Sequence, residues 1–64
     1  MPEGRQVVRI NGEKVNLLVR KQYTQNGFRY GYVFYKGEDL EVCRDTTIKQ
    51  ANGIVTYEWS VVRG

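Results

Sequence analysis

The chain has 64 residues, with ten Lys or Arg against seven Asp or Glu, no histidine and one cysteine. This length allows one small domain and leaves too little chain for a second hydrophobic core. A single cysteine excludes an intramolecular disulfide, and without histidine a zinc site is not expected, so packing has to hold the fold.

No long apolar stretch is typical of a signal peptide or a membrane span, and we expect a cytoplasmic protein that engages no membrane. The positive charge is concentrated in residues 1–36, where seven basic residues face two acidic ones for a net +5. The remainder has three basic and five acidic residues, a net −2. Such asymmetry can steer an anionic partner toward the first half of the chain.

Asn-Gly dipeptides at 11–12, 26–27 and 52–53 separate runs rich in Val, Ile, Thr, Tyr or Phe. Both central residues of a type I′ turn need positive φ, so each dipeptide predicts a tight hairpin. The predicted strands cover residues 5–10, 13–24, 28–36, 40–44, 46–50 and 54–62. Residues 1–4 are expected to form a flexible tail, and residues 5–64 a single all-β domain.

Two-residue turns fix the register of the first two hairpins. The first turn sets Val8 opposite Val15 and Arg9 opposite Lys14. The second turn predicts three opposed pairs, Val19 with Phe34, Lys21 with Tyr32, and Tyr23 with Tyr30. Alternation then places on one face Val8, Ile10, Val15, Leu17, Val19, Tyr23, Tyr30, Tyr32 and Phe34. The opposite face carries Arg9, Lys14, Asn16, Leu18, Arg20, Gln22, Arg29, Val33 and Tyr35.

The second half is predicted in the same way. Residues 37–39 form a three-residue turn that sets Val42 opposite Phe34 and Leu40 opposite Lys36. The third Asn-Gly predicts three further opposed pairs, Ile48 with Tyr57, Gln50 with Val55, and Thr46 with Trp59. The same register leaves on the outside Lys49, Thr56, Thr47 and Glu58.

These strands predict a small antiparallel meander of five to six strands with one apolar face. No helix is predicted to cover that face, so the sheet is expected to curl into an SH3-like or OB-like barrel. Two sheets packed face to face in a homodimer are the alternative, and the barrel is preferred.

Residues for catalysis are scarce, and we expect a non-enzymatic protein without cofactor or metal. Cys43 has no histidine to act as its base, and the acidic residues between 38 and 45 are typical of a polar turn followed by a solvated strand. Gly31 lies within a predicted strand, which indicates a bulge or sharp bend; close approach of a ligand to the backbone is the alternative.

The aromatic-rich segment at residues 27–36 contains Tyr30-Gly31-Tyr32-Val33-Phe34-Tyr35. These six residues resemble the last part of an RNP1 motif, in which strand aromatics stack on bases. The preceding Lys/Arg-Gly pair of that motif is missing, and the two helices of an RNA-recognition fold are not predicted. The resemblance implies base stacking by this strand.

Two surfaces are therefore candidates for binding. One is a stacking platform near the tip at 26–27, formed by Lys21, Tyr23, Tyr30 and Tyr32. The other lies across the sheet and would neutralise phosphates with Arg9, Lys14, Arg20 and Arg29 beside Tyr35. Either set also has a purely structural explanation, since tyrosine favours strands and Lys or Arg commonly solvate an outer face.

We predict a non-catalytic module that binds DNA or RNA. The predicted nucleic-acid-binding residues are Arg9, Lys14, Arg20, Lys21, Arg29, Tyr30, Tyr32 and Tyr35. The alternative is a protein-interaction module or small inhibitor, which would bind an acidic protein through a strand edge or the same Tyr/Arg surface.

Overall fold

The computed structural model describes residues 4–64, which form six strands and no helix. The strands are β1 (Gly4–Ile10), β2 (Glu13–Asn16), β3 (Arg20–Gln25), β4 (Phe28–Tyr35), β5 (Glu38–Lys49) and β6 (Val55–Arg63). The prediction of a small all-β protein is confirmed. The predicted tail at residues 1–4 lies outside the described residues except for Gly4, which begins β1. Nothing between residues 4 and 64 forms a helix able to cross a membrane.

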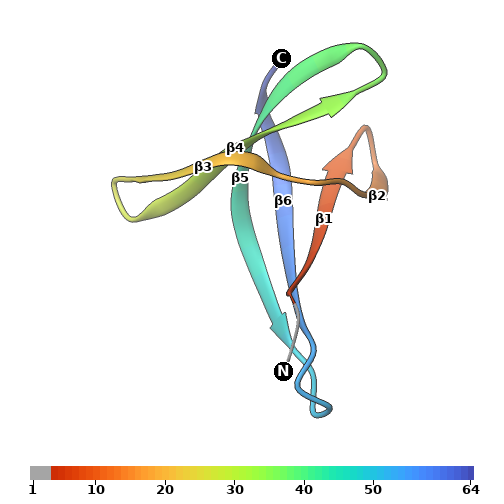
Figure 1. Ribbon diagram of the computed structural model, residues 1–64, viewed down its shortest axis with the longest axis vertical. Coiled ribbons are helices and arrows are strands. Elements are labelled where there is room, and N and C mark those ends of the chain that lie inside the picture. The colour runs from red at the N-terminus through yellow and green to blue at the C-terminus, as the bar shows by residue number, and fades with distance from the viewer. Residues whose placement is uncertain (1–3) are drawn as a thin grey trace.

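All six strands belong to one sheet in the order β2-β1-β6-β5-β4-β3 (Figure 1). The pairing of β1 with β6 is parallel and sets Val8 beside Trp59, whereas the other pairings are antiparallel. The predicted antiparallel meander is therefore wrong at this point. β1 lies beside the last strand instead of extending the meander, and this contact buries Val8 and Trp59 fully.

The link between β2 and β3 shows how strongly the sheet curls. These strands lie at opposite edges of the sheet, yet only residues 17–19 join them. Five strand spacings in a flat sheet amount to about 24 Å, whereas four extended residues reach roughly 14 Å. The edges must therefore bend toward each other. They are not paired, so the sheet is not closed, and the SH3-like or OB-like barrel remains a prediction.

The predicted long strand at 13–24 is interrupted. Val8 pairs with Val15 as predicted, and the tip of the second hairpin is also correct. Beyond that tip, Lys21 adopts a positive φ of 54° and the register shifts, so that Arg20 faces Tyr32. The predicted pair of Val19 with Phe34 is wrong because β3 begins only at Arg20. The predicted pair of Lys21 with Tyr32 is wrong because residues 21 and 22 of β3 stand opposite residue 31 alone, which shifts the register by one.

The turn between β4 and β5 is shorter than predicted. Lys36 and Gly37 both have positive φ, which makes a two-residue turn of the same kind as the Asn-Gly turns. Val33 consequently pairs with Leu40, and Gly31 with Val42. The predicted pairs of Val42 with Phe34 and of Leu40 with Lys36 are wrong. This register buries Val33 and leaves Phe34 61% exposed.

The β5–β6 hairpin differs from prediction by one residue along β5. Ile48 pairs with Thr56 instead of Tyr57, because the chain closes through a longer turn in which the Gln50 N–H donates to the Ile54 carbonyl at 2.9 Å. The predicted partners of Gln50 and Thr46 are wrong for the same reason. Thr56 and Glu58, predicted outside, are both buried.

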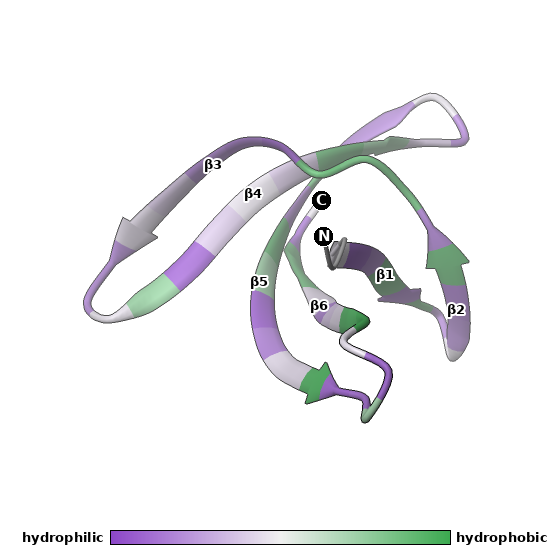
Figure 2. Ribbon diagram, turned by 60° about the horizontal axis from the view of Figure 1, so that its bottom comes forward, coloured by the Kyte–Doolittle hydropathy of each residue, from purple (hydrophilic) through white to green (hydrophobic). Residues whose placement is uncertain are grey.

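The core lies on one side of the sheet, here called the inner face. Its buried members are Val8, Ile10, Val19, Val33, Leu40, Val42 and Trp59. The Trp59 indole N–H donates to the Gln6 side-chain oxygen at 2.5 Å, which satisfies the one polar atom of this side chain. Val19 belongs to the hydrophobic link between β2 and β3, which lies over β4 (Figure 2).

The link between β2 and β3 explains why residue 31 is a glycine. A Cβ at this position would lie 2.4 Å from Val19 Cγ1 and 3.2 Å from the Arg20 carbonyl oxygen. The predicted bulge is absent from β4 itself, which pairs regularly with β5, and the irregularity lies opposite, in β3. Glycine is needed here because another segment of the same chain approaches the strand closely.

Candidate functional site

Cross-strand partners share a face of a sheet, so the pairing defines the outer face, opposite the core. One row of partners crosses all six strands and consists of Lys14, Arg9, Ser60, Cys43, Tyr30 and Tyr23. A second row consists of Arg20, Tyr32, Glu41 and Arg63. Two of the three predicted tyrosines, Tyr30 and Tyr32, therefore share one face with Arg9, Lys14 and Arg20, although the predicted register had put these tyrosines and basic residues on opposite faces.

The outward positions of β4 are all aromatic. We call Phe28, Tyr30, Tyr32 and Phe34 the aromatic stripe; they alternate with inward residues along a strand that pairs regularly with β5. Alternate residues of a strand lie about 6.8 Å apart. Phe28 is 58% exposed and Phe34 is 61% exposed, whereas the two tyrosines between them are half-buried. The stripe thus presents an accessible ring at each end.

Tyr23 of β3 extends the stripe sideways. Its ring stacks on Tyr30 with the centroids 5.3 Å apart and the planes 19° apart, and its centroid is 6.5 Å from that of Tyr32. The Tyr23 hydroxyl donates a short hydrogen bond to a Glu41 carboxylate oxygen, and the Tyr32 hydroxyl lies 3.4 Å from the same oxygen. Glu41 therefore fixes two of the three rings in place.

This arrangement also changes how Tyr23 titrates. The hydrogen bond to Glu41 raises the pKa of Tyr23 to about 12, with smaller contributions from burial and from the negative charge of Glu41. The phenol remains neutral at physiological pH and acts as a donor. The hydrogen bond thus holds a neutral ring in its stacked position against Tyr30.

Arg9 is occupied by carboxylates. Its guanidinium lies 2.5 Å from Asp45 and 2.5 Å from Glu58, and it donates to the Ser60 hydroxyl at 2.7 Å. These partners raise the pKa of Arg9, mainly through the hydrogen bond to Asp45, although burial opposes them. Burial acts to raise the pKa of Asp45, but hydrogen bonds from Ser60, Arg9 and Thr46 together outweigh it and lower that pKa. Arg9 thus links β1 to β5 and β6 through its ion pairs.

The other predicted phosphate ligands differ in their surroundings. Lys14 lies 3.5 Å from Glu58, and Arg20 lies 2.6 Å from Asp39, but both of these basic side chains remain substantially exposed. Lys21 is exposed at the irregularity in β3. Arg29 pairs with Arg44 on the inner side of β4, away from the stripe.

Tyr35 is likewise separated from the stripe. It packs against the core, and the Lys36 ammonium lies 5.3 Å from the centre of its ring. The structure therefore places five of the eight predicted residues on the outer face, Arg9, Lys14, Arg20, Tyr30 and Tyr32, with β5 and β6 between the first two and the tyrosines. The sequence-based site omitted Phe28, Phe34 and Glu41, and the alternation of aromatics from 28 to 34 is the signal that could have identified the two phenylalanines.

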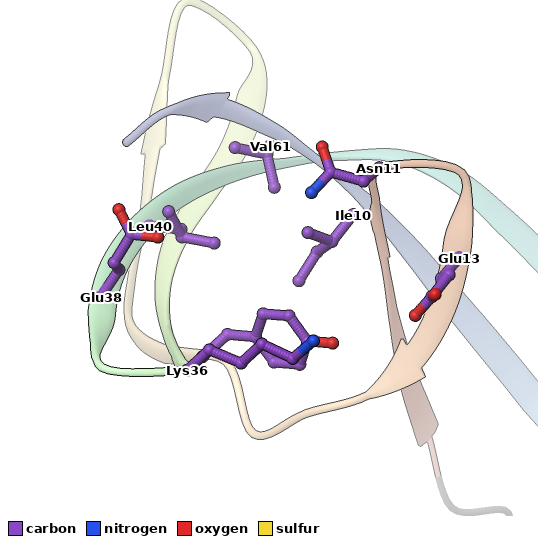
Figure 3. Close-up of a pocket in the computed structure, with 8 residues that line it drawn as sticks. Ile10, Asn11, Glu13, Lys36, Glu38, Leu40 and Val61 are labelled. Carbon is purple, nitrogen blue, oxygen red and sulfur yellow. The ribbon is translucent and has the colours of Figure 1, made fainter.

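A pocket of about 330 Å³ opens on the inner side, between the β1–β2 and β4–β5 turns (Figure 3). Ile10, Leu40 and Val61 supply its apolar wall, and Glu13 and Glu38 lie at its sides. None of its lining residues is a serine, threonine or cysteine nucleophile. Residues 4–64 contain no group of acidic or cysteine side chains arranged to hold a metal ion. The outer face is therefore the stronger candidate site.

Comparisons with protein-family models, curated proteins and solved structures found no match to this chain.

Proposed function

We propose that the protein is a non-catalytic module that binds single-stranded nucleic acid, with bases stacked on the aromatic stripe. The observation that carries the proposal is the run of four outward aromatics on one strand, with exposed phenylalanines at both ends. Base stacking on an aromatic side chain is worth about 1–3 kcal/mol and tolerates any sequence, because every base has a π-face.

The spacing along β4 favours a single strand. Rings about 6.8 Å apart are separated by twice the 3.4 Å rise per nucleotide of a duplex strand, which leaves room for bases unstacked from one another. Tyr23, held against Tyr30, widens the platform. A duplex keeps its base faces covered and offers no such surface to the stripe.

Phosphate contacts would come from the border of the stripe. Arg20 and Lys21 lie on β3, and Arg63 lies opposite Glu41. The ion pair of Arg20 with Asp39 is exposed, and exposed pairs contribute only about 0–1 kcal/mol, so a phosphate can replace the carboxylate. Few contacts of this kind give a shallow salt dependence, with a log–log slope of roughly −2 for three phosphates.

The test is titration of the protein with short oligothymidylates at several salt concentrations. Phe28→Ala and Phe34→Ala should each weaken binding about 5-fold to 100-fold, because each removes an exposed stacking surface. Leu18→Ala is the matched control, since Leu18 is 76% exposed but lies in the link outside the stripe. Absence of binding at low salt, or equal affinity of the phenylalanine variants and the control, would refute the proposal.

The scaffold proposed for this surface is the SH3-like or OB-like barrel, left open between β2 and β3. The three-residue link between the edge strands supports it, because the link keeps the two edges within about 14 Å of each other.

The second candidate is a protein-interaction module that binds a partner by adding a strand. The unpaired edges of β2 and β3 favour it, because an open edge is a template for an extended segment. A complex that forms without nucleic acid, survives moderate salt and does not depend on Phe28 or Phe34 would select this function.

A further inference from the structure

A second pocket, of about 370 Å³, lies where β4 and β5 separate. Their pairing ends at Arg29 and Arg44, beyond which the β3–β4 hairpin and the β5–β6 hairpin diverge (Figure 1). We call this the fork pocket; its lining residues are Thr24, Gly27, Phe28, Arg29, Arg44, Asp45, Thr46 and Thr47.

The fork pocket contains two arginines placed directly opposite each other. Like charges at opposed positions of a sheet destabilise it unless something compensates them. Within residues 4–64, neither Arg29 nor Arg44 has a carboxylate oxygen within 4.0 Å. Asp45 lines the pocket too, but its oxygens already accept hydrogen bonds from Arg9, Ser60 and Thr46. The pocket therefore has an excess of positive charge.

The two guanidinium groups are held differently. Arg44 stacks on Tyr57, with 4.4 Å between the guanidinium carbon and the ring centre, and lies 6.0 Å from the Trp59 ring. Stacking occupies the flat face of a guanidinium and leaves the N–H groups at its edge for an acceptor. Arg29 makes only a long contact of 3.4 Å to the Gln22 side-chain oxygen. Arg44 is thus fixed, and Arg29 is free to close on a ligand.

The chemistry of this pocket fits a tetrahedral oxyanion. Two arginines can bind phosphate through charge-assisted, bidentate hydrogen bonds. Thr24 and Thr47 add hydroxyl groups among the described lining residues. Phe28 lines the pocket and also forms one end of the aromatic stripe. Arg29 and Arg44 lie on the inner side of the sheet, so a strand on the stripe would reach them by turning past Phe28 into the gap between the two hairpins.

We propose that the fork pocket binds a phosphate group, held by Arg29 and Arg44, and that in the cell this is one phosphate of the strand stacked on the aromatic stripe. The second half of this statement rests on the proposed function. The first half concerns the pocket alone and is tested with inorganic phosphate.

The first experiment follows the side-chain Nε–H signals of the arginines by NMR while inorganic phosphate is added to the whole protein. The signals of Arg29 and Arg44 should shift together and saturate, whereas that of Arg5, on β1, should not. No saturable shift at Arg29 and Arg44, or an equal shift at Arg5, would overturn the phosphate pocket.

The second experiment compares Arg29→Gln and Arg44→Gln with Arg5→Gln, which removes the same charge from a strand separated from β5 by β6. Each pocket variant should weaken oligothymidylate binding about ten-fold or more and reduce the salt slope by about 1. Arg5→Gln should change the affinity less than about two-fold. If Arg44→Gln fails to fold because its stacking is lost, Arg29→Gln alone decides the outcome.

Oligonucleotides with and without a terminal phosphate identify the source of the phosphate. Tighter binding of phosphorylated ends indicates a terminal monoester. Equal binding, together with weaker binding by the arginine variants, indicates a backbone diester. If the Phe28 variant weakens binding but the arginine variants do not, the pocket is wrong and the proposed function stands. If phosphate binds the pocket and oligonucleotides do not bind the protein, the proposed function is wrong and the pocket stands.

Discussion

Arg9 forms ion pairs with carboxylates on two other strands, and its loss should lower the stability of the whole fold. Glu58 is buried and, among residues 4–64, would keep only Lys14, 3.5 Å away, as a cationic partner. We expect Arg9→Gln to lower the free energy of unfolding by about 1–3 kcal/mol, less than a fully buried pair because Arg9 is partly exposed. Urea denaturation measures this change. Arg20→Gln breaks an exposed pair and should cost less than about 1 kcal/mol; equal losses would contradict the structural role of Arg9.

Tyr23 gives a pH test of the contact with Glu41. Its pKa in the folded protein is about 12, above the value of 10.0 for free tyrosine. Folding therefore favours the neutral phenol, so this stabilisation is complete below pH 10 and is lost as the pH rises from about 10 to about 12. Ultraviolet titration of tyrosinate should show a phenol that ionises near pH 12. Glu41→Gln should move that titration toward pH 10, and an unchanged curve would show that Glu41 is not its cause.

At the scale of elements, the contact of the β2–β3 link with β4 depends on Gly31. Gly31→Ala would place a methyl group 2.4 Å from Val19 Cγ1, and we expect a loss of about 1–3 kcal/mol in the free energy of unfolding. Val19→Ala removes the colliding methyl groups. The double variant should therefore lose less stability than the sum of the single changes. Additive losses, measured by thermal or urea unfolding, would place the link away from Gly31.

The elements that sequence reasoning predicted correctly are those determined by neighbouring residues. The turns at 11–12 and 26–27 fixed the pairs next to them, because Asn and Gly accept positive φ. The turn at Lys36-Gly37 was missed because lysine rarely adopts positive φ. The predicted regular strand at 13–24 exchanged the faces of β4, because the irregularity at Lys21 reverses the alternation between Val19 and Tyr23. The prediction therefore assigned Phe34 to the apolar face.

The parallel pairing of β1 with β6 depends on contacts between the two ends of the chain, and local patterns carry no signal for it. The same limit affected the candidate site. Tyr30 and Tyr32 were identified from their own strand. That they share the outer face with Arg9 and Lys14 follows only from the order of all six strands.

At the scale of the whole molecule, the order of strands predicts which backbone amides are unpaired and exposed to solvent. β6 lies between β1 and β5, so both of its edges are paired, whereas β2 and β3 each have one unpaired edge. Amide hydrogen exchange should therefore be slowest in β6 and the paired part of β5. In β2 the amides should alternate, with those bonded to β1 exchanging slowly and those on the outer edge exchanging fast. Slow exchange at every amide of β2 and β3 would mean that these strands pair with each other or with a second chain, and that the sheet closes in solution.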